Sequence, residues 1–432
     1  MSPNAVARFG SSVYNGETSA KLKVRLVFFS KVGFTMFFEV AGLKFRNPFI
    51  VASGPATKHI SQLIEAERCG WGGASLKLAI EPAPYINLNP RYRWWDEEHY
   101  LAFSAETRLT PDEALRLTEQ GREQTKELII LANITYTGRK GMDGWLEMAK
   151  QFVDAGAHAL ELNMCCPNMS FNLKVSGERD RTAQSGASLG QNAEVVGMAT
   201  KIIADAVDVP VFVKLTPEGG GIAEVAQACF ESGAAVVGTT ANRLAIPEFD
   251  IHNPKRGPFR FQDQPSMACF SGGWLKPLAL RDVFEIRKKV GPVPCVLGTG
   301  GVRNHTDAIQ MMMCGADMIG ICTEVMLRGF AFLPAVLRNI EKFMARHGYD
   351  SYRNFRDIMV QSITPADHLS IRDVYAYVEP ELCDGCGRCK RIGHCYAITL
   401  KDQKAGVDPD QCTGCSTCQD LCHARAISFV RR

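Results

Sequence analysis

The sequence predicts an α/β fold in which a (β/α)₈ barrel is followed by a small cysteine-rich α+β domain. Two observations lead to this prediction. Eight short apolar runs rich in β-branched residues alternate with longer amphipathic stretches between residues 36 and 346, which is typical of repeated βα units. In addition, eight of the 16 cysteines lie in the last 50 of the 432 residues. A chain of this length exceeds the usual size of one domain, so a second folded unit is expected.

The eight apolar runs are expected to be parallel strands separated by helices. Eight such units predict a closed barrel whose active face is formed by the carboxyl ends of the strands. An open, doubly wound sheet is the alternative. In chain order the runs are residues 49–53, 74–80, 129–135, 159–164, 211–216, 235–240, 294–298 and 318–323.

Four segments are expected along the chain. Residues 1–35 show no sustained period and are interpreted as a poorly ordered N-terminal extension. Residues 36–346 form the barrel, residues 347–379 form a polar linker, and residues 380–432 form the cysteine-rich domain.

Composition and charge exclude some classes of partner. Hydrophobic residues make up 46% of the chain and charged residues 22%, and the net charge of +3 offers no field that would attract nucleic acid or an anionic membrane. The apolar run at residues 24–40 contains Lys31 and Glu39 and has no small-residue cleavage site, so neither a signal peptide nor a membrane span is expected. Clustered cysteines at ligand spacing favour a reducing compartment, and we therefore expect a cytoplasmic protein.

Polar residues and glycines stand where several of the strands end. Such residues contribute little to the apolar packing of a buried strand. In a barrel, the positions at the strand ends surround the mouth. They are Lys77, Asn133, Asn163, Lys214, Asn242, Gly300 and Gly301. An insertion at residues 92–103, YRWWDEEHYLAF, follows the second strand on the same face and is interpreted as a cover for the site or a docking surface.

The cysteine runs have the spacing of iron–sulfur ligands. They read CDGCGRCKRIGHC and CTGCSTCQDLC, and the fourth cysteine of such a run ligates the other cluster of a two-cluster domain. A pair of zinc sites is the alternative, but it would leave cysteines unused. The first [4Fe-4S] cluster is therefore expected on Cys383, Cys386, Cys389 and Cys422, and the second on Cys412, Cys415, Cys418 and Cys395.

This tail resembles the two-cluster bacterial ferredoxins, with two departures. The fourth cysteine of the first run follows after five residues instead of three, and Tyr396 and His423 stand where proline is common. The longer loop leaves the potential of the second cluster open.

Motifs along the rest of the chain resemble the dihydroorotate dehydrogenase superfamily of FMN-binding TIM barrels. Within it, the resemblance is greatest to the part of the dihydropyrimidine dehydrogenases that carries FMN and iron–sulfur clusters. The motifs are NPFIVASGPAT, SLKLAI, ELNMCCPN, GASLGQ, VKLTP, SGGW, KPLAL, GTGGV and ICTEV.

The resemblance and the chemistry of the residues together imply a site for FMN. Glycine-rich turns after the late strands allow backbone N–H groups to approach a phosphate, as expected for Gly272, Gly273, Gly300, Gly301 and Thr323. A lysine near the flavin ring stabilises its anionic reduced form, as implied for Lys77 and Lys214. Further flavin contacts are implied at Ala52, Ser53, Gly54, Asn133, Asn163 and Cys322.

Substrate recognition and proton transfer involve further polar residues. The amides of Asn163 and Asn242 suit a small cyclic substrate that contains a carbonyl, because an amide both donates and accepts hydrogen bonds. The family resemblance places a proton-donating cysteine where this chain has Leu189, so a serine is expected to donate the proton. The candidates are Ser188, Ser185 and Ser176, with Cys165 and Cys166 as weaker alternatives.

The function implied by the resemblance is oxidation or reduction of a C–C bond next to a carbonyl. No Gly-x-Gly-x-x-Gly motif follows a strand, so the clusters are expected to exchange electrons with a separate NAD(P)H-oxidising flavoprotein subunit or with ferredoxin, within an oligomer. Two alternatives remain open: a dihydroorotate-oxidising enzyme, and an electron-relay subunit without a substrate of its own. A tRNA-modifying flavoenzyme would need a basic face, and the balanced charge argues against it.

Overall fold

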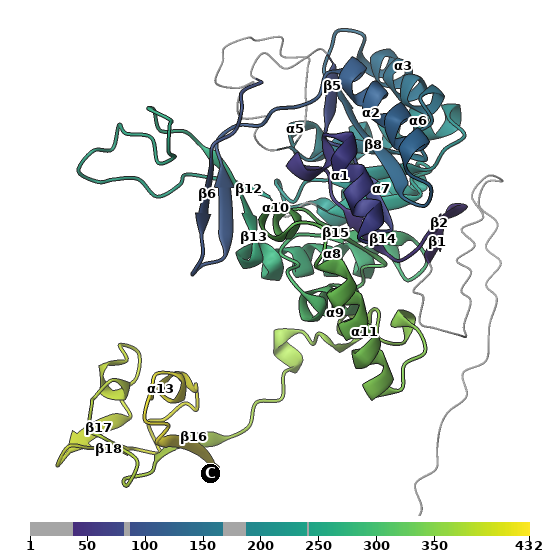
Figure 1. The fold of residues 1–432 in the computed structure, drawn as a ribbon. Coiled ribbons are helices and arrows are strands. Elements are labelled where there is room, and N and C mark those ends of the chain that lie inside the picture. The colour runs from purple at the N-terminus through teal and green to yellow at the C-terminus, as the bar shows by residue number, and fades with distance from the viewer. Residues whose placement is uncertain (1–37, 82–86, 167–186, 240–241) are drawn as a thin grey trace, which may run out of the picture. The chain divides into compact units, whose positions relative to one another are not determined.

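The chain forms two compact units in this computed structural model. One unit runs to Ser362 and the other from Ile363 to Arg432. The structure describes residues 38–81, 87–166, 187–239 and 242–432, which are coloured in Figure 1. The expected N-terminal extension, residues 1–35, lies outside this part of the chain.

Eight parallel strands of the first unit close into a barrel. β4 pairs with β3 on one side and with β8 on the other, which completes the ring. The predicted barrel is therefore confirmed, and the open doubly wound sheet is wrong because that sheet would leave two unpaired edges. The strands are β3 (Phe49–Val51), β4 (Gly73–Ser75), β8 (Ile129–Tyr136), β9 (Ala159–Met164), β10 (Val211–Leu215), β11 (Val236–Thr239), β14 (Cys295–Thr299) and β15 (Met318–Ile321).

Helices cover the outer surface of the barrel (Figure 1). Their ends follow local sequence signals: α2 begins after Thr110, whose hydroxyl accepts a hydrogen bond from the backbone N–H of Glu113 while the Glu113 side chain bonds back to Thr110. The main helices are α1 (Ile60–Arg68), α2 (Pro111–Gln124), α3 (Gly141–Asp154), α6 (Ala193–Ala206), α7 (Ile222–Glu231), α8 (Lys276–Val290), α9 (His305–Met313) and α11 (Leu333–His347).

One expected strand, at residues 74–80, is broken into two pieces. β4 ends at Ser75, and a short strand, β5 (Ala79–Glu81), pairs with the end of β8. Between them the backbone N–H of Lys77 bonds to the carbonyl of Thr57, 2.9 Å away, instead of to a neighbouring strand. Lys77 therefore stands where the chain leaves the barrel wall.

Two insertions combine into a second sheet beside the barrel mouth. The first forms the hairpin β6 (Tyr92–Trp95) and β7 (Tyr100–Phe103), and the second contributes β12 (Arg243–Ala245) and β13 (Ala268–Gly272). β13 pairs antiparallel with β7, giving the order β12-β13-β7-β6. β13 continues directly into the short helix η2 (Gly273–Leu275) and α8, so this sheet is joined to the barrel.

The stretch expected as a linker, residues 347–379, contains parts of both units. Tyr352 and Phe355 are buried in the core of the first unit, where Tyr352 contacts the ring of Phe38. Further along, β16 (Val374–Val378) pairs with the last strand of the second unit.

The second unit is built from two small antiparallel sheets. β16 pairs with β19 (Ile427–Arg431), and β17 (Ile398–Lys401) pairs with β18 (Lys404–Val407). A single helical turn, α13 (Thr417–Asp420), lies between β18 and β19 in the sequence. The core is small and apolar, and six of the eight clustered cysteines belong to it or pack against it. Among the helices in the described ranges, none has the length and apolar character needed to cross a membrane.

Candidate active site

A cleft opens at the carboxyl ends of the barrel strands. It encloses about 870 Å³, including the space at its open mouth. The inserted sheet forms one wall through Leu101, Phe103, Cys269 and Ser271. Of the residues expected from the sequence, the cleft is lined by Ala52, Ser53, Gly54, Lys77, Asn163, Lys214, Asn242, Cys322 and Thr323.

A smaller hollow of about 410 Å³ continues from the cleft, with Thr299 and Cys322 in the walls of both. Glycines form much of its wall, and all of the expected phosphate-binding residues are present. They are Gly272, Gly273, Gly300, Gly301 and Thr323. The structure thus brings the end of β13 together with the ends of the seventh and eighth barrel strands, β14 and β15.

Two of these glycines have conformations that another residue would not tolerate. Gly301 has φ +73°, and a Cβ atom there would lie 2.5 Å from the backbone nitrogen of Lys276. Gly272 has φ +111°, and a Cβ atom would lie 2.7 Å from the carbonyl oxygen of His99. Backbone without side chains can approach a phosphate closely, so this hollow fits the phosphate end of FMN.

Below the cleft, a buried polar network crosses neighbouring strands. Glu161 accepts hydrogen bonds from the hydroxyl of Ser75, at 2.5 Å, and from the amide of Asn133. The Nδ2 of Asn163 in turn donates to Oδ1 of Asn133 at 3.0 Å. Asn133 is 1% exposed and is not part of the cleft lining, so it supports Asn163 from below.

The same network acts on Lys214. Burial alone would lower the pKa of this lysine, but the Glu161 carboxylate raises it, and the net result is a pKa above the ordinary value. Lys214 therefore presents a positive charge to the cleft, as a group beside an anionic flavin ring would require.

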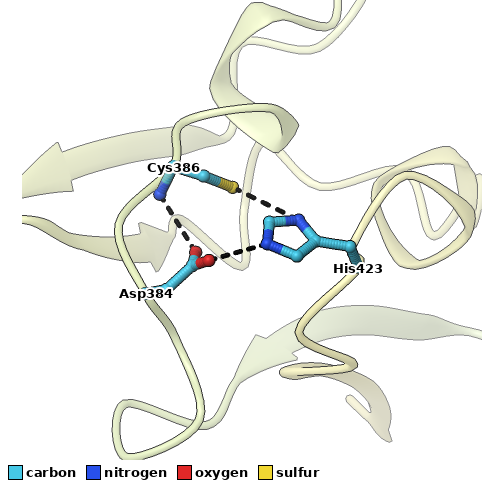
Figure 2. Close-up of side chains that lie close together, drawn as sticks. All are labelled: Asp384, Cys386 and His423. Carbon is cyan, nitrogen blue, oxygen red and sulfur yellow. Dashed lines mark hydrogen bonds and ion pairs between the residues drawn. The ribbon is translucent and has the colours of Figure 1, made fainter.

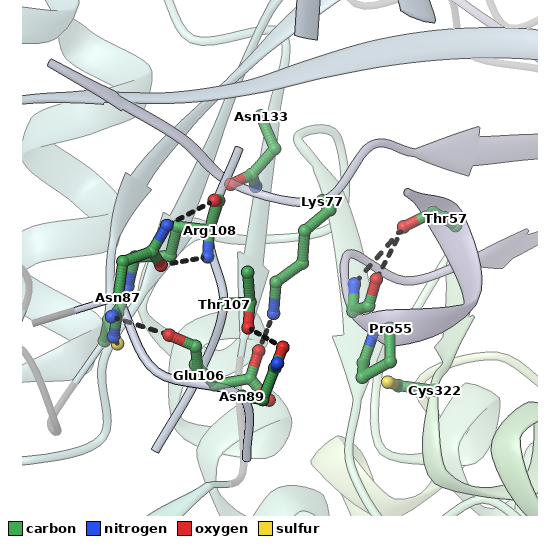
Figure 3. Close-up of polar contacts among 12 residues, drawn as sticks. Pro55, Thr57, Lys77, Asn87, Asn89, Glu106, Thr107, Arg108, Asn133 and Cys322 are labelled. Carbon is green, nitrogen blue, oxygen red and sulfur yellow. Dashed lines mark hydrogen bonds and ion pairs between the residues drawn. The ribbon is translucent and has the colours of Figure 1, made fainter. Parts of the chain in front are cut away.

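The cleft contains charged residues that sequence reasoning missed. The Nζ of Lys77 contacts the carboxylate of Glu106, and both groups are buried (Figure 3). Tyr92 donates a 3.2 Å hydrogen bond to the other oxygen of Glu106, and Arg108 also lines the cleft. Burial, followed by the positive charge of Arg108, lowers the pKa of Lys77 to about 7. Glu106 and Arg108 follow an insertion, where isolated charges usually indicate a solvated loop, so no local pattern predicted their place in the cleft.

Two cysteines of the cleft are poor sources of a thiolate. Burial raises the pKa of Cys165 to about 12, and burial also raises the pKa of Cys322. Both therefore remain thiols near neutral pH.

The serine candidates are only partly within the described structure. Ser188 lies in the short helix α5 (Ala187–Gly190), and the residues lining the cleft and the hollow do not include it. Ser176 and Ser185 lie outside the described residues. The next glycine, Gly190, packs so closely that a Cβ atom would lie 1.8 Å from the carbonyl oxygen of Met164, which holds α5 against the end of β9.

In the second unit, the eight clustered cysteines fall into two spatial groups. One cavity is lined by the four cysteines expected for the first cluster: Cys383, Cys386, Cys389 and Cys422. For the second set, burial and then the proximity of Cys412, Cys415 and Cys395 raise the pKa of Cys418 to about 11. In the structure, the first three cysteines of each run therefore lie with the fourth cysteine of the other run, as expected from the sequence.

The two cysteine runs repeat one backbone conformation. Gly385 and Gly414, at matching positions, have φ +71° and +69°, and the next matching pair, Gly387 and Ser416, has φ +69° and +67°. Left-handed residues at such positions turn successive N–H groups toward a common centre, a geometry found at iron–sulfur sites. The fit to two clusters is therefore supported by the backbone as well as by the thiols.

Histidines accompany the exposed cysteines. His423 Nε2 lies 2.8 Å from the Asp384 carboxylate, and its Nδ1 lies 4.0 Å from Cys386 Sγ (Figure 2). Asp384, Cys386 and His423 are close enough to hold a single metal ion, but Cys386 also lines the four-cysteine cavity. In the other group, the hydrogen bond from His394 at 3.5 Å is the largest cause that lowers the pKa of Cys415 to about 7, which favours the thiolate form that binds metal.

Comparison with known proteins agrees with this geometry. The Dihydroorotate dehydrogenase family matches residues 36–344. The NAD-dependent dihydropyrimidine dehydrogenase subunit PreA of Escherichia coli (strain K12) is 25% identical over 359 residues, covering 81% of this chain and 82% of that protein. The chloroplastic dihydropyrimidine dehydrogenase (NADP(+)) of Arabidopsis thaliana is also 25% identical, over 346 residues, covering 75% and 77%.

A third relative belongs to the dihydroorotate dehydrogenases. The catalytic subunit of dihydroorotate dehydrogenase B (NAD(+)) of Pyrococcus abyssi is 28% identical over 313 residues, covering 72% of this chain and 95% of that protein. The resemblance expected from the motifs is thereby confirmed. The chain belongs to the dihydroorotate dehydrogenase family and is an oxidoreductase that acts on CH–CH groups.

Proposed function

We propose that the chain is an FMN-dependent enzyme that interconverts a C=C bond and a CH–CH bond next to a carbonyl in a small cyclic substrate. Electrons pass through two [4Fe-4S] clusters in residues 380–432 to or from a separate partner. The main support is the cleft, where a glycine-walled hollow for a phosphate continues into a polar chamber with two buried lysines.

The residues present suit FMN and divide its binding between them. The backbone around Gly272, Gly300 and Gly301 would hold the phosphate, and Lys214 would face the part of the ring that becomes negative on reduction. When bound, FMN supplies the hydride chemistry. The chain contributes the positive charge and the polar groups that line the cleft.

The side-chain amides in the cleft orient the substrate. Asn163 and Asn242 both line it, and an amide pairs well with the alternating N–H and C=O groups of a cyclic amide. The hydrogen bond from Asn163 to Asn133 uses one amide proton, and the Oδ1 of Asn163 accepts 3.3 Å hydrogen bonds from the backbone N–H and the thiol of Cys165. The second amide proton of Asn163 therefore remains for the substrate.

A serine supplies the proton that accompanies hydride transfer. Ser188 is the first candidate, followed by Ser185 and Ser176, because Leu189 occupies the position where the family pattern has a cysteine. Substitution of the acting serine by alanine should lower turnover and leave substrate affinity nearly unchanged.

The clusters connect the flavin to an outside redox partner. Two sets of four cysteines and the repeated left-handed turns support two cubanes. The partner is an NAD(P)H-oxidising flavoprotein subunit or a ferredoxin. In keeping with this, the relative from Escherichia coli is called a subunit of an NAD-dependent enzyme.

A substrate screen under anaerobic conditions tests the proposal. The full chain is mixed with dihydrouracil, dihydrothymine or dihydroorotate, and bleaching of the flavin absorbance is recorded; uracil, thymine and orotate are then tested as oxidants of the reduced protein. Stoichiometric flavin reduction or reoxidation by a cyclic carbonyl compound supports the proposal. A flavin that reacts only with a redox partner, and with none of these compounds, would instead support an electron-relay subunit.

A further inference from the structure

The two cysteine runs of the second unit differ in length before the fourth cysteine. The first run places five residues, KRIGH, between its third and fourth cysteines, whereas the second run places three, QDL. The residue immediately before the fourth cysteine is therefore His394 in the first run and Leu421 in the second. Two sites that share one backbone pattern thus differ at this position in their ability to donate a hydrogen bond.

The longer loop of the first run is anchored on the second unit. Ile392 is buried in the core of this unit, and the backbone N–H of Cys395 bonds to the carbonyl of Ile392 at 3.1 Å. The N–H of Arg391 bonds to the carbonyl of Gly387 at 3.2 Å. His394 lies between Ile392 and Cys395, so these anchors limit where its ring can lie and lower the entropic cost of holding it there.

The ring of His394 reaches a cysteine of the other run. Its Nε2 lies 3.5 Å from Sγ of Cys415, which is hydrogen-bonding distance for the larger sulfur atom. This contact is the largest of the causes that lower the pKa of Cys415, ahead of the hydrogen bonds from Thr417. It stabilises negative charge on the sulfur, and a thiolate that ligates iron carries such charge as well. His394 is thus placed to donate to a ligand of the second cluster.

The matching cysteine of the first group, Cys386, has different surroundings. The Nε2 of His423 faces the Asp384 carboxylate at 2.8 Å, and its Nδ1 lies 4.0 Å from Cys386 Sγ (Figure 2). Asp384 also accepts a 3.1 Å hydrogen bond from the backbone N–H of Cys386. A carboxylate therefore stands beside this cysteine, and negative charge near a cluster disfavours the addition of an electron.

We propose that His394 raises the reduction potential of the second cluster by donating a hydrogen bond to Cys415, so that this cluster is reduced before the first. The inference rests on the proposed function for the presence of two clusters. Reduction adds one electron with no bond formed or broken, and the added negative charge is shared with the ligand sulfurs. A hydrogen bond donated to a ligand sulfur stabilises that charge, and such bonds are among the factors that set cluster potentials. The two clusters then provide two steps of different potential for the electrons that pass through the unit.

A redox titration followed by electron paramagnetic resonance tests the inference on the full chain, purified without exposure to oxygen. The unmodified protein is compared with His394→Leu, His394→Gln and His368→Leu. Leucine gives both runs the same residue at this position, whereas glutamine keeps an uncharged N–H donor. His368 is the matched control, because it is an exposed histidine of the second unit whose ring lies 4.0 Å from the Asp367 carboxylate. Cys383→Ser, which alters or removes the first cluster, identifies the unchanged signal as that of the second.

The unmodified protein should show two potentials, with the second cluster the more easily reduced. His394→Leu should lower the ratio of reduced to oxidised second cluster by about tenfold at a fixed applied potential, a shift of about 59 mV for one electron, and should leave the first cluster unchanged. His394→Gln should keep most of the unmodified potential, and His368→Leu should change neither cluster. Equal potentials in the unmodified protein, a second cluster that is harder to reduce than the first, or an unchanged second cluster in His394→Leu would overturn the inference.

A second measurement applies if His394→Leu does not assemble the second cluster. The unmodified protein, labelled with ¹⁵N-histidine, is held at a potential where only the more easily reduced cluster is reduced. Pulsed electron paramagnetic resonance should then detect coupling to a histidine nitrogen, and absence of this coupling would contradict the role of His394. Iron and acid-labile sulfide are measured in the same samples. A protein without them overturns the proposed function and this inference together, whereas two clusters without the expected order of potentials overturn only the inference.

Discussion

The Nδ2 of Asn163 donates a 3.0 Å hydrogen bond to Oδ1 of Asn133. Asn163 lines the cleft and Asn133 does not, so the buried amide of Asn133 positions the amide of Asn163. Asn133 also donates to Glu161, the carboxylate that keeps Lys214 charged. Two groups of the cleft therefore depend on one buried side chain on β8.

Replacing Asn133 tests this arrangement. Asn133→Ala should lower kcat/KM for the identified substrate by about tenfold, because removing one partner leaves buried polar groups unsatisfied at about 1–3 kcal/mol. Flavin should remain bound. Steady-state kinetics and flavin absorbance measure the two effects, and unchanged kinetics would show that Asn163 needs no support from Asn133.

The glycine-walled hollow gives a second prediction. Gly301→Ala should reduce flavin affinity by more than about tenfold, because the added Cβ would lie 2.5 Å from the nitrogen of Lys276. Gly291→Ala is the matched control: Gly291 also has a positive φ, +78°, but has nothing within 4 Å of the added atom and lies outside the hollow. Both variants share the conformational cost of about 1–2 kcal/mol, so only a selective loss of flavin from Gly301→Ala agrees with the phosphate site.

The cysteine grouping predicts which substitutions affect iron. Cys422→Ala should lower the iron content from about eight atoms per chain to between about four and seven, because one cluster loses a ligand. Cys69→Ala, in the barrel, should keep the full content, since Cys69 is a buried thiol at the end of α1. Iron analysis and electron paramagnetic resonance of the reduced proteins measure this, and full iron content in Cys422→Ala would exclude Cys422 as a ligand.

His158 predicts a pH dependence of stability. Burial, and then the charge of Arg122, lowers the pKa of His158 from 6.5 to about 4, and its Nδ1 accepts a 3.0 Å hydrogen bond from the N–H of Ile130. Between these pKa values the unfolded chain binds more protons than the folded chain, so the folded state loses stability as the pH falls below 6.5.

When the pH is lowered from about 7 to about 5, the free energy of unfolding should fall by on the order of 1 kcal/mol. The fall is smaller than a fully buried histidine would cause, because the ring of His158 is partly exposed to solvent. His158→Asn should be less sensitive over the same interval, since its amide oxygen can accept the same bond without titrating. Unfolding midpoints at the two pH values give the comparison, and parallel losses in both proteins would contradict the assignment to His158.

The barrel could be predicted because its strands are buried on both faces. Such strands appear as continuous apolar runs, and residues at their ends, such as Lys214 and Asn163, share one rim by the geometry of parallel strands. The grouping of the cysteines followed in the same way from spacing alone, since Cys395 and Cys422 stand at the end of each run.

The inserted sheet could not be predicted, for a physical reason. β7 and β13 pair across more than 160 residues of chain, for example Ser271 with Leu101, and no local pattern encodes such a contact. For the same reason the sequence did not show that Glu106 returns to contact Lys77. Ser416 is a further case, because its left-handed φ becomes apparent only by comparison with Gly387 in the matching run.

The most direct test is the cofactor content of the full chain purified without exposure to oxygen. The account predicts about eight iron atoms, about eight acid-labile sulfides and about one FMN per chain, with the flavin reducible through the clusters. Zinc in place of iron and sulfide, or a protein that cannot hold FMN, would contradict it.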